Sequence, residues 1–383
     1  MKGFLQPGDY YFQGNEACVE GAIIAGCRYF SGYPITPASE ISETASIRMP
    51  QVGGVFIQME DELASVCSLI GASWAGAKAL TATSGPGFSL MQEAISVAIM
   101  AETPFVIINV QRPGPGQGYI TASQGDVMQA RWGPHGGGSL IVLAPASVQE
   151  MMNFTIEAFN LAEKWRSPVI ILADEPVAHM QEKVVVPPLE EIEVINRVTP
   201  QELGITPEDY LPFGGQEVPP MAAFGDGYKI NVVSLVHHPD SNIGHYSAKL
   251  NYECVSRKVR KIEDNVDEIS KLDVQFLEDS DHVIVCYGTP ARPAYEAMLE
   301  ARAENIRIGY VRLKTLWPFP EKKLRHLIRE AAHIFMPEEN LGLMIHSVIE
   351  ALRDRVSQFI PIPSLGVLHS PELILRKIRE VIR

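Results

Sequence analysis

Apolar runs and segments of helical periodicity alternate over residues 15–175 of the chain. The apolar runs at residues 105–110, 141–143 and 169–172 are continuous, with no polar residue at every second position. Continuous runs are typical of strands that are buried on both faces, as in a parallel sheet covered by helices. The pattern therefore predicts an α/β domain with a parallel sheet, which we assign to residues 1–182.

The pattern changes over residues 183–275, which are rich in proline and glycine and show little periodicity. A long stretch of this kind is typical of a functional excursion or of a linker between domains. It contains one predicted helix, at residues 247–272. The alternation then returns, with final helices near residues 341–356 and at 371–382. We therefore expect residues 276–383 to form a second, smaller α/β domain.

Two kinds of residue mark the expected helix starts. One has a side chain that accepts a hydrogen bond from a free N–H group of the first turn, and the other is proline, which has no N–H group there. Asn15 is the expected cap of the first long helix, because its side-chain oxygen can accept a hydrogen bond from one of those groups. Pro37 is expected at the first position of the next helix, where a missing N–H has no effect. Ser370 and Pro371 give the same cap and proline signal for the last helix.

The charge balance limits the partners that the chain can bind. It carries 32 Lys+Arg against 46 Asp+Glu, a formal net charge of −14, and has no block of basic residues. Such a balance repels phosphate backbones, so we expect no nucleic-acid partner. No apolar run reaches the roughly 18 residues of a membrane helix, and the first residues lack the apolar core of a signal peptide. We expect no membrane partner and a cytoplasmic location.

Five cysteines are scattered along the chain without CxxC or CxxxC spacing. They are Cys18, Cys27, Cys67, Cys254 and Cys286. An odd, scattered set indicates neither a disulfide framework nor the ligands of zinc or of an iron–sulfur cluster. The ten histidines offer no HxH or HExxH spacing. We therefore expect no metal site in this chain, and any metal cluster would be carried by another chain.

Two polar residues follow the first strands of the predicted parallel sheet, at whose carboxyl edge ligands bind. Thr36 lies between Pro34 and Pro37, which fix the backbone around its hydroxyl. Glu62 opens a helix of apolar and small residues, a position that can hold a carboxyl in a dry site with a raised pKa. The alternative interpretations are a rigid capping turn for Thr36 and a solvated first helical turn for Glu62.

Two further turns follow the next strands. Residues 84–87, Ser-Gly-Pro-Gly, either bring the backbone close to a ligand before a helix N-terminus or form a tight turn without a ligand. Arg112 follows the run 105–110 beside a glycine-rich segment, which suits a carboxylate substrate and a mobile lid. A surface arginine in a loop is the alternative. Each signal is weak alone, but their occurrence on four successive strand ends predicts a site.

A Gly-Asp-Gly triplet at residues 225–227, followed by Asn251, loosely matches a pattern that binds Mg²⁺ and a diphosphate. No buried strand precedes the triplet, which lies in the irregular stretch of the chain. We therefore predict a β-turn at this position and no diphosphate site.

Five motifs, in this order and spacing, resemble those of the α subunit of 2-oxoacid:ferredoxin oxidoreductases, and the 2-oxoglutarate type is the nearest match. The motifs are GYPITP at 32–37, QMEDE at 58–62, TATSGPG at 81–87, QGDVMQARWG at 124–133 and LWPFP at 316–320. The resemblance runs from Phe12 to the C-terminus. It implies a pyrimidine-binding domain of the thiamine diphosphate enzymes, followed by a smaller α/β domain like the transketolase C-terminal domain.

The resemblance also implies a reaction, its cofactors and its partners. The family oxidises a 2-oxoacid such as 2-oxoglutarate with CoA, and yields an acyl-CoA such as succinyl-CoA, CO₂ and reduced ferredoxin. Thiamine diphosphate would be shared with a β subunit that holds the diphosphate, its Mg²⁺ and a [4Fe-4S] cluster. Separate γ and ferredoxin-like δ subunits are expected. The chain alone would be inactive, because it would hold half of the cofactor site.

The resemblance assigns roles to four residues. In the family, the glutamate at the position of Glu62 pairs with the aminopyrimidine of the cofactor, and the proline at the position of Pro34 lies beside it. Thr36 and Arg112 match residues that contact the carboxylate and the oxo group of the substrate. Glu62, Thr36 and Arg112 are therefore the expected catalytic residues.

The segment after Arg112 reads GPGQG, where many sequences of the 2-oxoglutarate type read more like GPSTG. A distal carboxylate on the substrate needs a second donor or cation. Arg131 and His135 are the candidates in this chain, and the partner subunit is the other source. A branched-chain 2-oxoacid, 2-oxoisovalerate, is the alternative substrate. A non-catalytic scaffold of the same fold and a thiamine enzyme that uses no ferredoxin are the alternative classes.

Overall fold

The computed structural model describes residues 3–245, 247–353 and 358–382 of the chain. Its strands are β1 (Gly8–Gln13), β2 (Cys27–Gly32), β3 (Val55–Gln58), β4 (Lys78–Thr83), β5 (Phe105–Gln111), β6 (Ile141–Leu143), β7 (Pro168–Asp174), β8 (Gln181–Val186), β9 (Leu272–Gln275), β10 (His282–Cys286), β11 (Ile308–Leu313), β12 (Thr315–Trp317), β13 (His333–Glu338) and β14 (Gln358–Pro363).

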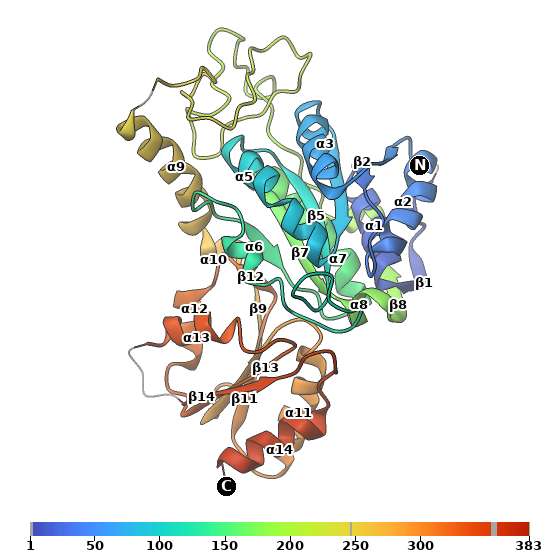
Figure 1. Ribbon diagram of the computed structural model, residues 1–383, viewed down its shortest axis with the longest axis vertical. Coiled ribbons are helices and arrows are strands. Elements are labelled where there is room, and N and C mark those ends of the chain that lie inside the picture. Colours follow the sequence, from blue (N-terminus) through green and yellow to red (C-terminus); the bar gives the residue numbers. More distant parts are fainter. Residues whose placement is uncertain (1–2, 246, 354–357, 383) are drawn as a thin grey trace.

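The helices fill the segments between these strands (Figure 1). They are α1 (Gly14–Ile24), α2 (Ser39–Gln51), α3 (Glu62–Trp74), α4 (Gly85–Leu90), α5 (Gln92–Met100), α6 (Gln129–Trp132), α7 (Val148–Trp165), α8 (Glu175–His179), the 3₁₀ turn η1 (Leu189–Glu191), α9 (Ala248–Glu263), α10 (Val266–Ile269), α11 (Ala291–Ala303), α12 (Glu321–Ile328), α13 (Ile345–Ala351) and α14 (Pro371–Ile382). None of the helices in the described ranges is long and apolar enough to cross a membrane.

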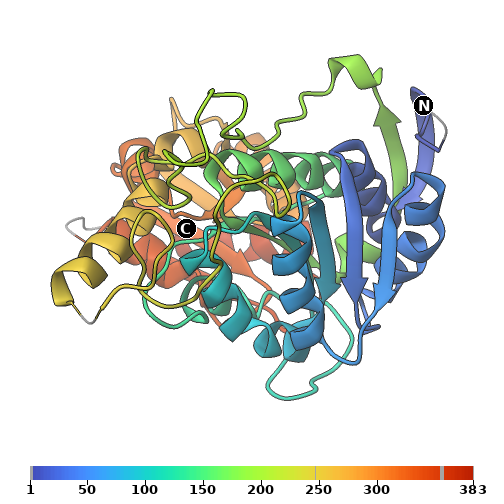
Figure 2. The same cartoon turned by 90° about the horizontal axis from the view of Figure 1, so that it is seen from above.

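The first sheet has seven strands among the described residues, in the order β12-β6-β7-β5-β4-β2-β3. All neighbours are parallel except β12, which pairs antiparallel with β6 and comes from the C-terminal part of the chain. Every residue of the central strands β4, β5 and β7 is buried. The continuous apolar runs of the sequence therefore form parallel strands that are buried on both faces, as predicted. A separate antiparallel pair, β1 with β8, joins the N-terminal residues to the end of this region (Figure 2).

The second sheet has five strands in the described part of the chain, in the order β14-β13-β10-β11-β9, and only β9 is antiparallel to its neighbour. One of its faces packs on α11 and α14 through an apolar cluster that includes Met298 and Ile378. The other face shares a cluster with the first sheet, in which Val285 and Ile334 join Leu172. The two sheets are therefore held together by a common apolar core.

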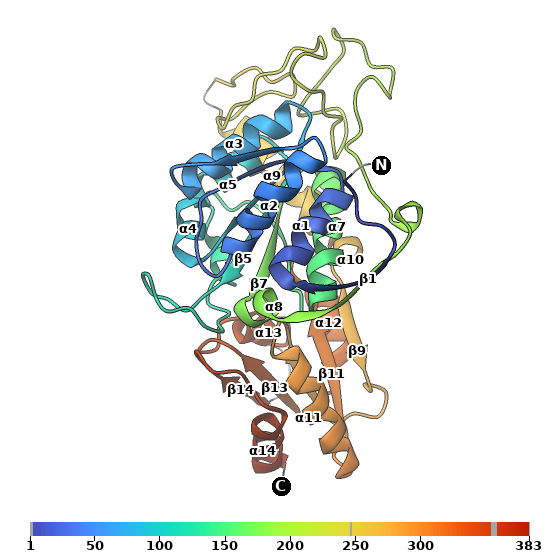
Figure 3. The same ribbon diagram turned by 90° about the vertical axis from the view of Figure 1, so that its right-hand side faces the viewer.

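The chain between η1 and α9 is irregular and lies at the opposite end of the molecule from α14 (Figure 3). It is nevertheless anchored by buried contacts. Arg166, which is buried, donates hydrogen bonds from Nη1 to the carbonyl oxygens of Pro212 and Pro219, at 2.8 and 3.0 Å. Trp74 packs on Phe213. These contacts give the irregular segment a defined position, although it contributes no strand to either sheet.

The helix predicted for residues 247–272 is wrong beyond Glu263. Helix α9 ends there, and α10 and β9 follow. The helix does not reach Leu272, because this residue begins the antiparallel edge strand β9 and pairs with β11, a tertiary contact that overrides local propensity. Helix α13 is also shorter than the predicted helix near 341–356, of which residues 354–356 lie outside the described residues.

Two predicted helix starts are wrong and one is confirmed. Helix α1 begins at Gly14, so Asn15 lies inside it, and its buried Nδ2 donates to the carbonyl oxygen of Pro37 at 2.9 Å. Asn15 therefore holds the turn before α2 instead of capping α1. Pro37 belongs to that turn, because α2 begins at Ser39. Ser370 caps α14 as predicted, since its Oγ accepts a hydrogen bond from the N–H of Leu373 at 3.1 Å.

Candidate active site

Four loops meet at the carboxyl edge of the first sheet. Thr36 follows β2, Glu62 follows β3, residues 84–87 follow β4 and Arg112 follows β5. The strands lie side by side in the order β5-β4-β2-β3 and are parallel, so their ends face the same side of the sheet. The fold therefore gathers the four predicted strand ends at one edge, where ligands bind in sheets of this type.

Glu62 is the first residue of α3, and only 4 % of its surface is exposed. Asp61 caps the helix in its place, by accepting a hydrogen bond from the N–H of Ala64 at 2.7 Å. The Glu62 carboxyl forms no hydrogen bond with another side chain among the described residues. Burial raises the pKa of Glu62, and the nearby charge of Arg112 opposes that rise only in part. Glu62 is therefore a dry carboxyl that holds its proton more tightly than a solvated one.

Gly87 allows the backbone of α4 to approach Glu62. A Cβ at this position would lie 2.3 Å from both Glu62 Oε1 and Thr83 Oγ1, so no other residue fits without displacing them. The hydroxyls of Thr83 and Ser84 are buried and have no hydrogen-bond partner among the described residues. Buried polar groups are normally paired. The unpaired hydroxyl of Thr83, close to Glu62 on the other side of Gly87, therefore indicates a polar ligand at this strand end.

Arg112 lies next to Thr36 and is only 7 % exposed. Its Nη1 donates to the carbonyl oxygen of Thr36 at 2.8 Å, and its Nη2 donates to Gln117 Oε1 at 2.9 Å, while Nε is buried without a partner. The structure thus brings these two predicted site residues into direct contact, through the Thr36 main chain. The Thr36 side chain and Pro34 are exposed, with Thr36 Oγ1 3.5 Å from Ser39 Oγ.

Behind Arg112 lies a buried network that the sequence analysis missed. Gln111 Nε2 donates to Asp174 Oδ1 at 3.1 Å, and Gln111 Oε1 accepts from the N–H of Asp126 at 3.0 Å. Asn109 Nδ2 donates to Asp126 Oδ2 at 2.8 Å. Two of these groups lie within the run FVIINVQ, where polar residues interrupt an otherwise apolar strand. That interruption was the available signal, since a polar side chain in a strand buried on both faces needs a partner.

The network continues into the second sheet and ends at a pair of buried acids. Asp174 Oδ2 accepts hydrogen bonds from the N–H of Thr289 at 2.6 Å and from Gln124 Nε2 at 2.9 Å. Glu339, just after β13, is buried, and neither of its carboxyl oxygens has a hydrogen-bond partner within the described ranges. Burial raises the pKa of Asp174 to about 7, and burial together with the charge of Asp174 raises the pKa of Glu339 to about 9. Asp174, through its hydrogen bond from Thr289, links the first sheet to the second.

Arg131 and His135, the two candidates for a distal carboxylate, are not brought into contact with Arg112 or Thr36. Arg131 donates to the carbonyl oxygen of Gly138 at 2.8 Å and forms an ion pair of 3.3 Å with Glu263. His135 is exposed and lines a different cavity, beside α5 and α9. A structural role, in holding the loop before β6, accounts for Arg131 in this structure.

The triplet at 225–227 forms a turn, as predicted. Asp226 Oδ2 accepts a hydrogen bond from the N–H of Ala223 at 2.9 Å, and the N–H of Asp226 donates to the Ala223 carbonyl oxygen at 3.2 Å. The turn lies in the irregular segment and not at a strand end. Across the described ranges, no group of three or more His, Cys, Asp or Glu side chains could hold a metal ion.

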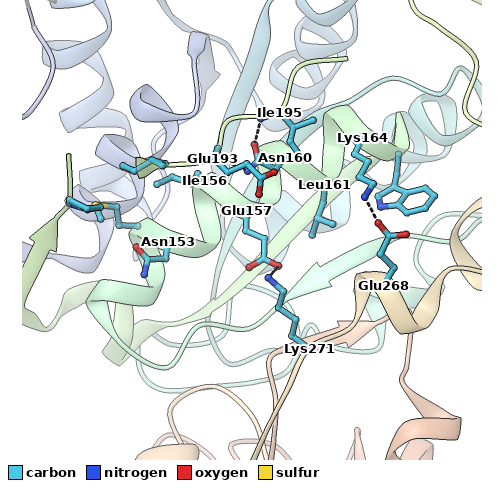
Figure 4. Close-up of a pocket in the computed structure, with 14 residues that line it drawn as sticks. Asn153, Ile156, Glu157, Asn160, Leu161, Lys164, Glu193, Ile195, Glu268 and Lys271 are labelled. Atoms are coloured by element: carbon cyan, nitrogen blue, oxygen red, sulfur yellow. Dashed lines mark hydrogen bonds and ion pairs between the residues drawn. The ribbon is translucent and has the colours of Figure 1, made fainter. Parts of the chain in front are cut away.

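A cavity of about 460 Å³ lies along α7 and residues 187–195, away from the strand ends (Figure 4). Four of its charged residues form two ion pairs: Lys271 contacts Glu157 at 2.6 Å, and Lys164 pairs with Glu268. Asn160 Oδ1 accepts from the N–H of Ile195. Because both of its lysines are already paired, this cavity offers an anionic ligand little, and it lies away from the strand ends where ligands bind in sheets of this type.

Two family models match the chain. Residues 20–256 match the thiamine diphosphate-binding domain of pyruvate flavodoxin/ferredoxin oxidoreductases. Residues 280–367 match core domain II of pyruvate:ferredoxin oxidoreductase. The α/β fold and the thiamine diphosphate-binding domain implied by the five motifs are thereby confirmed.

Similar proteins cover the chain almost completely. The 2-oxoglutarate synthase subunit KorA of Methanothermobacter thermautotrophicus is 44% identical over 383 residues, which cover 98% of this chain and 99% of that protein. The subunit of the same name from Methanocaldococcus jannaschii is 47% identical over 374 residues, which cover 96% of this chain and 98% of that protein.

A solved structure has the same fold. It is described as 2-oxoglutarate:ferredoxin oxidoreductase from Magnetococcus marinus with 2-oxoglutarate, coenzyme A and succinyl-CoA bound, and it matches with a TM-score of 0.91 and 33% identity. The match covers 98% of this chain and 65% of that one, so this chain spans less than two thirds of the other's length. On these three likenesses and the family models, the chain belongs to the 2-oxoacid:ferredoxin oxidoreductases, as an α-type subunit that carries the thiamine diphosphate-binding domain.

Proposed function

We propose that the chain is the α subunit of an enzyme that oxidatively decarboxylates 2-oxoglutarate with CoA, to give succinyl-CoA, CO₂ and reduced ferredoxin. The single observation that carries the proposal is the buried carboxyl of Glu62 close to the Thr83 hydroxyl, which has no partner among the described residues. Relatives named for 2-oxoglutarate support the choice of substrate.

The residues around Glu62 fit the aminopyrimidine of thiamine diphosphate. That ring presents a basic nitrogen and an amino group, and the unpaired groups of this edge offer a carboxyl and hydroxyls. The cofactor, when bound, supplies the carbanion chemistry of decarboxylation. Glu62 would hold the ring nitrogen by sharing a proton with it, which its raised pKa favours. Pro34 would line the same site in this proposal.

Arg112 and Thr36 bind the 2-oxoacid itself. A guanidinium can hold a carboxylate with two parallel hydrogen bonds, and Arg112 keeps one nitrogen, Nε, without a partner. The Thr36 hydroxyl is exposed at the same loop, where it can donate to the charge that develops on the oxo group. The contact between Arg112 and the Thr36 carbonyl oxygen holds the two groups in a fixed relation.

The rest of the cofactor site lies in other subunits in this proposal. A β subunit would hold the diphosphate, Mg²⁺ and a [4Fe-4S] cluster, and γ and ferredoxin-like δ subunits would complete the complex. Exposed apolar side chains around the strand ends support a covering partner: Tyr33, Leu63 and Tyr119, the last with 74 % of its surface exposed. The pyrimidine-binding domain would then comprise residues 1–182, and the excursion residues 183–275. The transketolase C-terminal-like domain would comprise residues 276–383.

The distal carboxylate of 2-oxoglutarate is assigned to the partner subunit. Arg131 is engaged by Glu263 and Gly138, and His135 lies along another cavity, so neither supports the distal role that the sequence suggested. Arg131→Ala should therefore leave KM for 2-oxoglutarate unchanged, provided that the variant assembles.

The test is CoA-dependent reduction of methyl viologen by the complex that co-purifies with this chain, under anaerobic conditions. 2-Oxoglutarate, pyruvate and 2-oxoisovalerate are supplied in turn. Reduction with 2-oxoglutarate alone is expected. Reduction with 2-oxoisovalerate in its place would contradict the substrate but keep the reaction. No reduction with any substrate, from a complex shown to contain thiamine diphosphate and intact clusters, would contradict the function.

A further inference from the structure

Helix α9 carries a buried cysteine and a buried lysine one turn apart. Cys254 and Lys258 occupy positions i and i+4, which are neighbours on one face of a helix. Lys258 Nζ lies 3.0 Å from Cys254 Sγ, and the two residues are only 5 and 8 % exposed, respectively. The amine therefore faces the sulfur directly.

Lys258 differs from the other buried lysine of α9 in the groups around its ammonium. Among the described residues its ammonium has no carboxylate partner; the neighbours of Nζ are Cys254, His237 Nε2 at 3.4 Å and the ring of Phe213 at 5.9 Å. Lys261, on the next turn of α9, instead forms an ion pair of 2.8 Å with Glu102. A lysine needed only for stability would be expected to have such a partner.

His237 accepts a hydrogen bond from Lys258, because the tautomer of its ring is fixed by another contact. Its Nδ1 lies 2.8 Å from the carbonyl oxygen of Leu235, so Nδ1 carries the hydrogen and Nε2 is left as an acceptor toward Lys258. Burial, with a smaller contribution from the charge of Lys258, lowers the pKa of His237 to about 4. The ring is therefore neutral at physiological pH and keeps Nζ oriented beside the sulfur.

A cavity borders the lysine of this pair. It has a volume of about 410 Å³ and lies between α5 and α9, and Lys258 is part of its wall, together with Val255 and Leu235. Hydrogen peroxide is small enough to enter a space of this size, and Cys254 Sγ lies 3.0 Å from Lys258 Nζ. Cys67, by contrast, is exposed on α3, and no lysine in the described part of the chain forms a hydrogen bond with its sulfur. It provides an internal comparison.

We propose that Cys254 and Lys258 form a modification site, at which a hydroperoxide oxidant links Sγ to Nζ in a sulfenamide. The peroxide O–O bond breaks first: one oxygen becomes the hydroxyl of a sulfenic acid on Cys254, and the other leaves as water. The amine of Lys258, after its ammonium has released a proton to solvent, then attacks the sulfur. The S–O bond breaks, and the hydroxyl leaves with one amine proton as a second water.

The balance of this reaction is one thiol, one amine and one hydrogen peroxide, which give one S–N bond and two waters. The sulfur loses two electrons and the peroxide gains them. Added thiol reverses the reaction by attacking the sulfur, which restores the amine and gives a mixed disulfide that a second thiol reduces. The link removes the positive charge of Lys258 and its hydrogen bond to His237.

The test is peptide mass spectrometry of the assembled complex after treatment with equimolar hydrogen peroxide. Free thiols are then alkylated under denaturing conditions, and the chain is cleaved after glutamate, which releases residues 254–263 as one peptide. The expected product is this peptide, unalkylated and lighter by two hydrogens than the reduced form. Dithiothreitol should restore the free thiol. Cys67→Ser is the background, because it removes the exposed competing thiol.

Two variants keep the proposal falsifiable. Cys254→Ser and Lys258→Arg should each abolish the light peptide, since arginine keeps the charge but its guanidinium stays protonated and does not attack. The proposal is overturned if Cys254 remains alkylatable while Cys67 of the unmutated chain oxidises, or if it becomes a sulfinic acid or a disulfide with Lys258 free. A peptide heavier by one oxygen and lighter by two hydrogens would mean an S–O–N bridge or a sulfinamide, and either would overturn the assigned product.

Discussion

Glu62 and Glu102 are both buried in the first sheet's region, yet their surroundings are opposite. Glu102 pairs with Lys261 at 2.8 Å and with Arg257, and these cations hold its pKa well below the usual range against the effect of burial. Glu62 has no ion pair among the described residues, and burial raises its pKa. Glu102 is therefore kept ionised, whereas Glu62 is protonated more readily than a solvated carboxyl.

The difference separates a carboxyl that holds the structure together from one that is kept for a ligand. A buried charge that is paired on all sides joins elements, and Glu102 links the end of α5 to α9. A buried carboxyl without a partner is unfavourable in the isolated chain, and a protein keeps it where a ligand completes the set. Exchanging each glutamate for glutamine should therefore affect different properties.

Glu62→Gln should give the largest effect on activity. Gln keeps the size of the side chain but cannot share a proton with a ring nitrogen, so viologen reduction should fall by about 10²–10⁴-fold. Thermal unfolding of the chain should not shift to lower temperature, because no ion pair is lost. A variant that keeps at least half of the wild-type rate would contradict the role of Glu62. Loss of subunits on gel filtration would show that the residue acts in assembly.

Glu102→Gln is the matched control and should destabilise the chain. Removing one partner of a buried ion pair leaves uncompensated charges, which lowers the free energy of unfolding by about 3–5 kcal/mol. The lowered pKa sets the pH dependence: the stabilisation by Glu102 is present above its unfolded pKa and is lost as pH falls through the lower folded pKa. Chemical denaturation at pH 7 measures the loss of unfolding free energy in the variant, and the same measurement at pH 4 tests its pH dependence. Equal stability of variant and wild type at pH 7 would contradict the structural role.

Arg112→Lys should lower kcat/KM for the 2-oxoacid by about 10–100-fold, mainly through KM. Lysine keeps the charge but not the planar pair of donors, and hydrogen bonds to charged groups contribute about 1.5–3 kcal/mol. Arg292→Lys is the control, because Arg292 is an exposed arginine that pairs with Glu182 at 2.7 Å. Steady-state kinetics at varied 2-oxoglutarate separates KM from kcat. A change in kcat alone would contradict substrate binding by Arg112.

The strand ends could be predicted from the sequence because each one is marked by a short stretch of neighbouring residues. Continuous apolar runs mark β5 and β7, and Thr36, Glu62 and Arg112 each stand just after a strand. Parallel order then brings such ends together without further information. The helix cap at Ser370 was predictable for the same reason, since the cap and its partner Leu373 are three residues apart.

Contacts between distant residues could not be predicted in this way. Asn15 was expected to cap a helix, but its side chain binds the turn at Pro37, which lies 22 residues further along the chain. The helix predicted for residues 247–272 was expected to be continuous, but it ends at Glu263 and Leu272 begins β9, which pairs with β11. Asp174 and Glu339 meet only because β7 and β13 belong to two sheets that pack together. Nothing in either local pattern shows that the other acid is near.

That acid pair allows the smallest of the predicted effects to be measured, a change in how stability depends on pH. Burial raises the pKa of Asp174 and Glu339 in the folded chain. The folded state thus binds protons that the unfolded state has released, so stability is greatest below the unfolded pKa values and falls as pH rises toward about 9, by at most about 1.4 kcal/mol per pH unit for one group.

Glu339→Gln should remove the contribution of Glu339 to the pH dependence of stability. The variant should be more stable than wild type at about pH 8.5 and differ little from it at about pH 5, whereas Glu296→Gln, at an exposed position, should match wild type at both values. Chemical denaturation at a series of pH values between about 5 and 8.5 measures the slope directly. A wild-type slope that Glu339→Gln leaves intact would show that the carboxyl is charged when folded. In that case Glu339 would need a cationic partner from another subunit of the assembled complex, as Glu102 has Lys261 and Arg257 within this chain.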